Sequence, residues 1–521
     1  MYPTQINSIR NASGWFSGGV FSVLLALTSG CASVPTDYPR TTSNAFENHE
    51  STKIGASFAE EAARYPGKSG FSIIRKGRYA FTDRIAMTRL AEKTLDVQYY
   101  IWEPDDTGRI LAEHLLQAAD RGVRVRLLVD DMNIAGRDAA AASLDVHPNI
   151  EIRIFNPFAN RDSAMFDFLV DFGRVNHRMH NKIMVMDNTL VIVGGRNIGD
   201  HYFGVNTEAN FRDLDIAAAG PVVRDVSKVF DRFWNSDWAV PVAALADRQY
   251  TQADLQQTTT WMREQIAKGN YPYSIDEDIA TLTGQLATIR KNLIWAPGRI
   301  VWDDPSSIMA EGEERSVMAE ALYKKLDKLQ HELTIESAYF VVGKRGVNAI
   351  TKLCDRGVKV RVLTNSLASN DVIAAHAGHA EFRDDLLATC AKIYEIRPDA
   401  GVIHKQWEGN SRAGLHTKAL VFDRESVFIG SFNLDPRSAN INTEAGLYVE
   451  SPELAEQVLA YMDEGVKPEN SYQVKMDADG DLYWETVIDG NTVRYDEEPE
   501  STFGQRFQSK LIELLPVESQ L

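Results

Sequence analysis

The chain contains one short pattern twice, roughly half a chain apart. Both copies follow H-x-K-x4-D, with His180, Lys182 and Asp187 in the first copy and His416, Lys418 and Asp423 in the second. With 11 His in 521 residues, composition alone would yield about 0.04 such matches by chance. The pattern therefore marks an internal duplication, and any fold for this chain must accommodate two similar units.

The two copies stay in register beyond the motif. Counted from each His, both carry Asn at +17 and Glu at +28, which are Asn197, Glu208, Asn433 and Glu444. Upstream, residues 120–128 (DRGVRVRLL) are similar to residues 355–363 (DRGVKVRVL), at an offset of 235. The duplicated unit is therefore much longer than the motif itself.

Strand and helix patterns alternate within each unit. Residues 110–119 space their apolar side chains as an amphipathic helix does, and Gly122 stands where that helix should end. Residues 123–129 and 358–363 are short β-branched runs typical of strands. This alternation predicts an α/β fold in which helices cover the sheet. We expect two such lobes, related by a pseudo-twofold axis, with both His-Lys pairs in one site between them.

The bulk composition is that of a globular protein with an acidic balance. At 521 residues, 44% hydrophobic and 25% charged, the chain is long enough for two substantial cores. Its net charge is −18 and its sequence pI is near 5.2. Nucleic-acid binders normally carry a basic excess, so we expect no nucleic-acid partner, although an acidic protein can still hold a local basic cleft.

The N-terminus has the composition of a targeting segment. Residues 1–30 contain a short apolar core and end in Leu27-Thr28-Ser29-Gly30 before Cys31. This arrangement resembles a bacterial lipoprotein signal, in which Cys31 becomes the lipidated first residue of the mature chain. It predicts a membrane-anchored protein of the cell envelope on the periplasmic side. Ala32 directly after the Cys, instead of Asp, resembles the signal for sorting to the outer membrane. An ordinary secretory signal or an uncleaved anchor is the alternative.

The remaining chain divides by composition and by the duplication. We expect a tether over 31–70, a first lobe over 71–240, an inter-lobe insertion over 241–312, a second lobe over 313–465, and a C-terminal hairpin and helix over 466–521. The final helix spaces Phe503, Phe507 and Leu511 along one face, which we expect to dock onto the body, with a membrane surface as the alternative. Cys354 lies on a predicted helix before a Gly, which favours a buried free thiol over a disulfide.

The paired motifs suit chemistry at a phosphodiester. A neutral imidazole is nucleophilic near pH 7 without adding negative charge, and a second, protonated imidazole can give the leaving alkoxide its proton. We therefore assign His180 and His416 to these two roles. Lys182 and Lys418 can bind the non-bridging oxygens.

The other repeated polar residues suit supporting roles. Asn197 and Asn433 offer further amide donors. Glu208 and Glu444 are expected to orient the rear nitrogen of each His, which fixes its tautomer. Asp187 and Asp423 point away from the lysines on an unbroken strand, so we interpret them as structural anchors.

No metal or other cofactor is expected. His177 and His180 are three residues apart, as are His376 and His379, but neither pair has a neighbouring cluster of Cys or carboxylates. The acidic stretch 477–481 resembles a calcium loop, yet its Gly stands at the wrong position and Ile488 replaces the last ligand. We interpret this stretch as a turn.

Together these positions resemble the phospholipase D superfamily, and within it the bacterial cardiolipin synthases. The resemblance covers about residue 75 to the C-terminus and rests on both motifs, on Gly194-Gly195-Arg196-Asn197, on Gly430-Ser431-Phe432-Asn433, on residues 363–372, on His376-Ala377-Gly378 and on the closing Leu515-Pro516-Val517-Glu518. It implies α/β/α sandwich lobes, a metal-independent two-step mechanism and a phosphohistidine intermediate.

The resemblance also implies a reaction. Its members join a phosphatidyl group from phosphatidylethanolamine to phosphatidylglycerol, so the expected partners are phospholipids. It assigns the nucleophile to His180 and the acid/base role to His416, a choice that the symmetry of the sequence cannot make.

Three other functions compete with phosphatidyl transfer. A hydrolytic phospholipase D would use the same residues with water as acceptor, releasing phosphatidic acid. A nuclease is less favoured by the acidic balance and the absence of a basic tail. A lipid-binding lipoprotein with an inactive site is opposed by the intact His, Lys, Asn and Glu in both copies.

Overall fold

The computed structural model describes residues 33–134, 136–161, 163–269, 271–275, 277–309, 316–401 and 411–513. The predicted signal, Cys31 and the last residues of the predicted final helix lie outside these ranges. Within these ranges, no helix has both the length and the apolar character needed to cross a bilayer.

The first half of the chain forms a nine-stranded sheet in the order β10-β1-β8-β6-β5-β2-β3-β4-β9. Strands β2, β3 and β4 are parallel neighbours, whereas β2–β5, β5–β6, β6–β8 and β1–β8 are antiparallel pairs. The strands are β1 Ser69–Ile74, β2 Thr94–Tyr99, β3 Arg124–Asp130, β4 Ile150–Phe155, β5 Ile183–Met186, β6 Leu190–Gly194, β8 Asp215–Ala219, β9 Ala239–Pro241 and β10 Ile294–Ala296.

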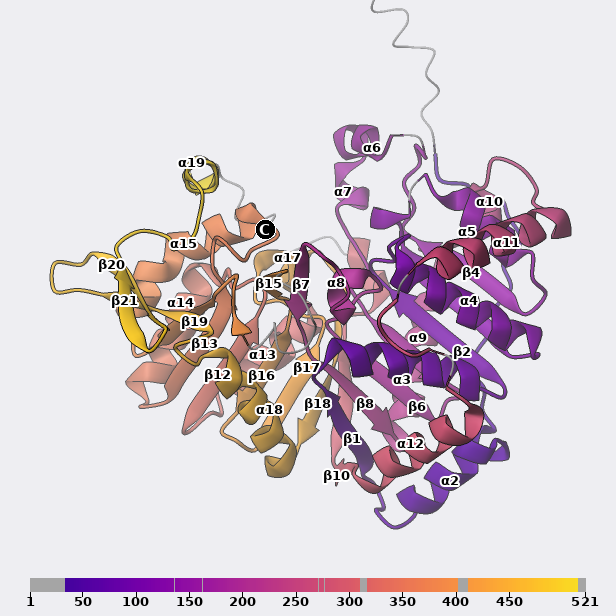
Figure 1. Ribbon diagram of the computed structural model, residues 1–521, viewed down its shortest axis with the longest axis horizontal. Helices are drawn as coiled ribbons and strands as arrows, with labels where there is room; N and C mark the ends of the chain where they lie inside the picture. Colours follow the sequence, from indigo (N-terminus) through magenta and orange to yellow (C-terminus); the bar gives the residue numbers. More distant parts are fainter. Residues whose placement is uncertain are drawn as a thin grey trace, which may run out of the picture.

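Helices cover this sheet, as Figure 1 shows for α3, α4 and α9. The helices of this half are α2 Lys53–Ala62, α3 Gly77–Leu90, α4 Asp106–Asp120, α5 Asp138–Asp145, α6 Ala164–Val170, α7 Phe172–Val175, α8 Asp200–Phe203, α9 Pro221–Trp234, α10 Val242–Leu245, α11 Gln252–Lys268 and α12 Ile279–Lys291. Helix α4 is the one predicted over 110–119. It begins after Asp105, which caps the Gly108 N–H at 3.0 Å, and ends before Gly122, which has a φ of 93°.

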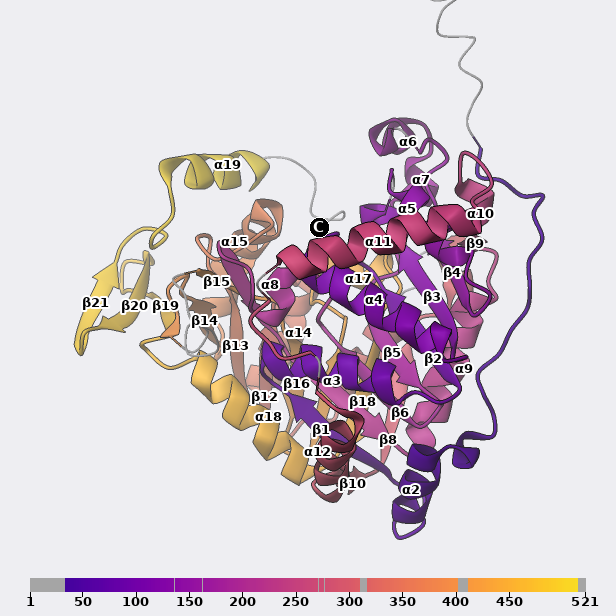
Figure 2. The same ribbon diagram turned by 45° about the vertical axis from the view of Figure 1, so that its right-hand side comes forward.

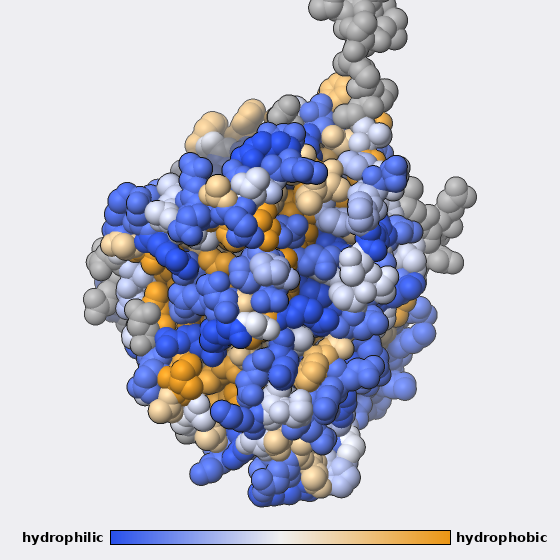
Figure 3. Space-filling view, turned by 90° about the vertical axis from the view of Figure 1, so that its right-hand side faces the viewer, coloured by the Kyte–Doolittle hydropathy of each residue, from blue (hydrophilic) through white to orange (hydrophobic). Residues whose placement is uncertain are grey.

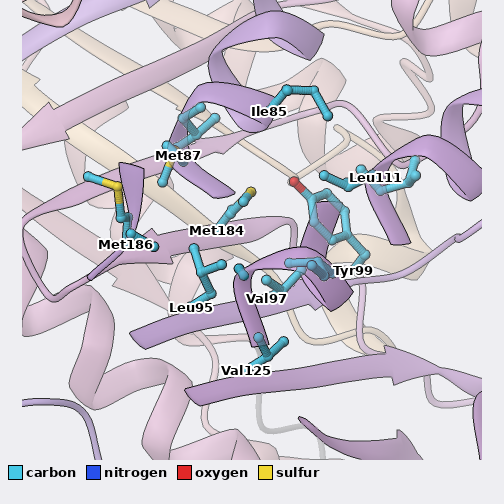
Figure 4. Close-up of a cluster of buried hydrophobic side chains, with 14 of the residues drawn as sticks. Ile85, Met87, Leu95, Val97, Tyr99, Leu111, Val125, Met184 and Met186 are labelled. Carbon is cyan, nitrogen blue, oxygen red and sulfur yellow. The ribbon is translucent and has the colours of Figure 1, made fainter. Parts of the chain in front are cut away.

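The core of the first lobe lies between its sheet and helices α3 and α4. Figure 4 shows Leu95, Val97 and Tyr99 of β2 meeting the methionines of β5 beneath Ile85 and Leu111. Tyr99 is fully buried, and its hydroxyl accepts a hydrogen bond of 2.8 Å from Arg84 Nε. Apolar side chains at alternate positions of β2 thus hold the helical layer on this face.

The second half repeats the arrangement in a ten-stranded sheet ordered β11-β18-β17-β16-β12-β13-β14-β19-β20-β21. Its strands are β11 Gly298–Trp302, β12 Glu332–Ser337, β13 Lys359–Asn365, β14 Lys392–Ile396, β16 Lys418–Phe422, β17 Ser426–Gly430, β18 Ala445–Glu450, β19 Ser471–Met476, β20 Leu482–Ile488 and β21 Asn491–Tyr495. Its helices are α13 Val317–Leu326, α14 Gly343–Asp355, α15 Ile373–Leu387, α17 Pro436–Asn440, α18 Pro452–Gly465 and α19 Phe503–Glu513. The predicted two-lobed α/β fold is confirmed.

The two lobes share an apolar core. Side chains of β5, β6 and β8 pack with those of β16, β17 and β18, including Val185, Val193 and Ile216 on one side and Val421 and Leu447 on the other. A two-stranded parallel sheet, β7 (Ala209–Arg212) with β15 (Arg412–Leu415), joins the lobes and lies between them in Figure 1. The lobes therefore form one continuous body.

The segment predicted as an inter-lobe insertion contributes to both sheets. Strand β10 pairs with β1 of the first sheet, and β11 pairs with β18 of the second. Only Pro297 separates these two strands, and its carbonyl accepts the Glu450 N–H at 2.9 Å. The chain thus passes directly from one sheet into the other.

The C-terminal segment extends the second sheet. The predicted hairpin is confirmed as β20 and β21, joined through Asp489 and Gly490, both with positive φ. Helix α19 packs on α15, but Phe503, Phe507 and Leu511 face outward. The prediction that this apolar face docks onto the body is wrong, because α19 turns a polar side, including the buried Ser509, toward the protein.

The cysteine prediction is also wrong. Cys354 and Cys390 form a disulfide, with their Cα atoms 5.5 Å apart. Cys354 lies in the last turn of α14, before β13, and Cys390 lies two residues before β14. Because β13 and β14 are parallel neighbours, the residues that lead into them meet at the same sheet edge.

Candidate functional site

The first motif histidine contacts an acid from the opposite lobe. Met179 forms a parallel bridge with Thr443, and the His180 N–H donates to the Thr443 carbonyl at 2.9 Å. This pairing places the next residue of each segment side by side. His180 Nδ1 therefore lies 2.9 and 3.0 Å from the two carboxylate oxygens of Glu444.

The second motif histidine repeats the arrangement in the opposite sense. Leu415 pairs with Arg212 in the β7–β15 sheet, and the His416 N–H donates to the Arg212 carbonyl at 2.8 Å. His416 Nδ1 then lies 2.7 Å from Asp213 Oδ2. Each histidine thus takes its carboxylate partner from the other lobe.

Both contacts define which ring nitrogen can react. A carboxylate accepts the proton of Nδ1, so each neutral imidazole carries its hydrogen there and keeps a lone pair on Nε2. Both histidines are buried, and their carboxylate partners are fully buried. The two Nε2 atoms are therefore the nitrogens available for a nucleophile and for an acid.

The expected role of Glu208 at a histidine is not what the structure shows. Glu208 is exposed on the approach to β7, where its carbonyl accepts the Arg412 N–H at 2.8 Å, and Asp213 makes the contact with His416. Asp213 lies 33 residues after His180, whereas Glu444 lies 28 residues after His416. The segment between the His and the acid is therefore five residues longer in the first copy. Counting 28 residues from His180 for this reason gives Glu208 instead of Asp213.

One sequence signal does mark Asp213. It lies two residues before strand β8, whose residues 216–219 are apolar, and Glu444 directly precedes the apolar strand β18. Aligning the acids to the strands that follow them, instead of to the histidines before them, identifies the correct residue.

The residue fifteen positions after each histidine contacts the carboxylate of its own lobe, and its size matches the length of that acid side chain. Ser431 Oγ donates to Glu444. In the first copy this position is Gly195, where an added Cβ would lie 2.2 Å from Asp213 Oδ1. The shorter Asp side chain thus sits directly against the backbone, and only Gly leaves it room.

The motif lysines are buried beside the histidines. Lys418 Nζ donates to the His416 carbonyl at 2.6 Å, and Lys182 Nζ donates likewise to the His180 carbonyl. Burial lowers the pKa of Lys418 to about 8 and the pKa of Lys182 well below its usual value, and the charge of Lys418 lowers the latter further. Two crowded cations favour an anionic group between them.

The two motif copies form one electrostatic unit. Burial, and then the charges of Lys182 and Lys418, lower the pKa of His180 well below its usual value. The pKa of His416 is lowered by burial, by both lysines and by His180. Because each histidine interacts with charges of the other copy, both pairs share one site, and both imidazoles are neutral near pH 7.

Aromatic rings hold the two imidazoles in place. The Tyr100 ring meets His180 edge-on with centroids 4.9 Å apart, and the Tyr202 ring meets His416 in the same way at 5.0 Å. Tyr202 also accepts a hydrogen bond of 2.9 Å from Asn197 Nδ2, whose Oδ1 accepts the Ile101 N–H at 3.2 Å. Asn197 is therefore already engaged within its own lobe.

Asn433 differs from its counterpart. It is buried, and within the described ranges its Oδ1 has no hydrogen-bond partner.

The two motif aspartates lie outside the site. Asp187 accepts the backbone N–H groups of residues 92–94 at 2.7–2.9 Å, and Asp423 those of residues 330–332 at 2.8–2.9 Å. They tie each motif strand to the loop before its neighbouring strand.

The other histidine pairs make ordinary contacts. His177 Nδ1 lies 2.6 Å from the Ile441 carbonyl, and His376 Nε2 lies 3.1 Å from Glu498. Over the part of the chain that the structure describes, no three His, Cys, Asp or Glu residues gather in a way that could hold a metal. Asp477 accepts the Asp479 and Asp481 N–H groups, which makes this acidic segment a turn.

Comparison with known proteins identifies the family. The model described as "Cardiolipin synthase, PLD-like domain" matches residues 85–234 and 322–465, one match in each lobe. The chain is 38% identical over 462 residues to cardiolipin synthase C of Escherichia coli, covering 88% of this chain and 97% of that protein. It is 24% identical over 386 residues to a cardiolipin synthase of Halalkalibacterium halodurans, covering 72% of this chain and 62% of that protein.

A solved structure supports the fold. The phosphatidylserine synthase of Haemophilus influenzae superposes with a TM-score of 0.55 at 13% identity, covering 89% of this chain and 100% of that one. The two family matches fall on the two lobes that contribute the crossed His–carboxylate pairs. The chain therefore belongs to the cardiolipin synthase family of the phospholipase D superfamily.

Proposed function

We propose that this protein is a phosphatidyltransferase that forms cardiolipin from phosphatidylglycerol, with phosphatidylethanolamine as the phosphatidyl donor. The observation that carries the proposal is the pair of buried imidazoles, each with Nδ1 on a carboxylate of the opposite lobe, beside two buried lysines. The names of the similar proteins support the same reaction.

In the first step, His180 Nε2 attacks the phosphorus of the donor lipid. The bond between phosphorus and the headgroup oxygen breaks, and His416 gives its proton to that oxygen. His416 must be protonated for this step, and the negative charge of the bound phosphate favours its protonation. Lys182 and Lys418 stabilise the charge on the non-bridging oxygens as the transition state forms.

In the second step, a glycerol hydroxyl of phosphatidylglycerol replaces the enzyme. The hydroxyl gives its proton to His416, its oxygen bonds to phosphorus, and the P–N bond to His180 breaks. Glu444 and Asp213 hold both rings in the required tautomer throughout. Water in place of the hydroxyl would give phosphatidic acid, which is the hydrolytic alternative.

Product analysis tests the proposal. Purified protein is incubated with phosphatidylglycerol labelled in its acyl chains, with and without phosphatidylethanolamine. We expect labelled cardiolipin, formed faster when phosphatidylethanolamine is present, together with released ethanolamine. Phosphatidic acid as the main product would instead support hydrolysis, and no lipid turnover would overturn the proposal.

The same assay can assign the nucleophile. A phosphatidyl donor with a p-nitrophenol leaving group needs no acid, so the His416→Ala variant should still form the covalent intermediate but resolve it slowly. Mass spectrometry of the quenched protein should find the phosphatidyl group on the peptide that carries His180. An adduct on His416 in the His180→Ala variant would reverse the assignment.

The crossed acids allow a matched test of the site. The Asp213→Asn amide can donate to Nδ1 and favours the wrong tautomer of His416, so we expect kcat to fall by about 10²–10⁴-fold. Glu208→Gln, at the exposed position, should change kcat by less than about twofold. Steady-state rates and thermal unfolding midpoints of both variants provide the measurement, and equal losses would contradict the assignment.

The buried lysines predict that kcat/KM falls at alkaline pH. Burial lowers the pKa of Lys418 to about 8, so kcat/KM should fall as the pH rises through about 8 and the ammonium is lost. The pKa of His180 is lowered well below its usual value by burial, so His180 is already neutral near pH 8 and its titration does not set this limit. In Lys418→Met no ammonium titrates at this position, so the fall near pH 8 should disappear from the residual activity. An unchanged limit would assign it to another group.

We further propose that the mature protein is a lipoprotein, lipidated at Cys31 and held on the periplasmic side of the envelope. The Cys354–Cys390 disulfide supports an oxidising compartment. In protein isolated from cells with all thiols blocked at lysis, both cysteines should react with a second thiol reagent only after reduction. Mass spectrometry should find diacylglycerol on Cys31, and free thiols at both positions in fresh cells would contradict this location.

A further inference from the structure

Helix α19 exposes the side that an amphipathic helix normally buries. Phe503, Phe507 and Leu511 are four residues apart and 77%, 61% and 51% exposed, and the two Phe rings stack at 6.3 Å. The helix rests on α15, and Ser509 on its inner side is only 4% exposed. Packing on the body therefore does not account for this apolar stripe.

Helix α6 shows the same inversion on the other lobe. Met165, Leu169 and Val170 are 72%, 78% and 63% exposed, and Phe166 and Phe172 are also exposed. The buried side of the helix holds Asp167, which accepts the Asn160 N–H at 2.9 Å. Asp167 and Phe168, whose ring packs on Phe158 with centroids 5.6 Å apart, thus hold the helix while Met165, Leu169 and Val170 face away from the protein.

These two surfaces project from the same end of the molecule. Figures 1 and 2 both place α6 and α19 at the top, with α2 and α12 at the opposite end. In Figure 1, β7 and β15, which end just before Asp213 and His416, lie between and below them. Helix α7 ends at Val175, five residues before His180, and leads directly into the first motif.

The segment below α6 and α7 is firmly held. Asn156 Nδ2 donates to the carbonyls of Arg174 and His177 at 2.9 and 2.8 Å, and Arg437 of the opposite lobe donates to the Asn176 carbonyl at 2.7 Å. The exposed apolar side chains thus stand on a base fixed to the site, so their depth in an apolar phase would set the position of the site relative to that phase.

We propose that α6–α7 and α19 form a two-point docking surface for a phospholipid bilayer. Met165, Leu169, Val170, Phe503, Phe507 and Leu511 enter the acyl region, one group on each side of the site. The proposal rests on the proposed function, since a phospholipid substrate reaches the histidines from a bilayer. A flat, fluid phase accommodates two separate apolar points without a shaped groove.

Charge does not drive this docking. The chain carries a net charge of −18, which opposes attraction to an anionic membrane. The side of the first lobe turned toward the viewer in Figure 3 is predominantly hydrophilic, with apolar residues in small groups. Binding through the two apolar points should therefore depend little on salt.

Vesicle binding tests the proposal. The full chain carries Cys31→Ala throughout, so that a lipid anchor cannot hold it, and is mixed with vesicles of equal parts phosphatidylethanolamine and phosphatidylglycerol. We expect Leu169→Glu with Phe507→Glu to lower the vesicle-bound fraction by about tenfold or more, because both points lose insertion. Ile279→Glu, an exposed apolar residue on α12 at the opposite end, should bind like the parent.

Two controls separate the possible outcomes. Thermal unfolding midpoints show that the variants fold. Turnover of a short-chain phosphatidylglycerol below its micelle concentration tests the proposed function without a bilayer, so its absence in the parent would overturn that function and not the docking surface. Unchanged vesicle binding in the double variant, or release of the parent by high salt, would overturn the docking proposal.

Discussion

The crossed contact between each motif histidine and a carboxylate of the opposite lobe is the constraint on which the rest of the structure depends. His180 meets Glu444 and His416 meets Asp213, so neither lobe holds a complete site alone. The lobe interface must therefore be rigid. The shared apolar core, the β7–β15 sheet and the fully buried ion pair between Arg212 and Glu336 at 3.0 Å fix it in place. A buried pair of this kind contributes specificity of arrangement more than net stability.

The two halves reach the same geometry with different residues. In one half, a bridge between Met179 and Thr443 brings His180 to a Glu that a serine hydroxyl supports. In the other half, a full pair of strands brings His416 to a shorter Asp packed against Gly195. The duplicated unit has thus kept the position of a carboxylate oxygen at Nδ1 while the side chain and the loop that deliver it changed.

Much of this could be predicted from local patterns, and the failures have physical reasons. Apolar periodicity and turn residues located β3, β13, α4 and the β20–β21 hairpin, because these elements depend on neighbours in the sequence. Equal spacing leads to Glu208, and misses Asp213, because it ignores a five-residue difference in a loop. The Cys354–Cys390 bond depends on the order of parallel strands, and the outward face of α19 depends on what α15 offers it. Neither can be derived from spacing along the chain.

The single residue between β10 and β11 has a mechanical consequence. Because the chain leaves one sheet and enters the other across Pro297 alone, the two sheets are covalently connected at that edge by a single residue. A hinge opening of the two lobes would break the pairing of β10 with β1 or of β11 with β18. Together with the shared apolar core, this connection opposes separation of the lobes, so we expect motion that admits a lipid to be confined to side chains and surface loops.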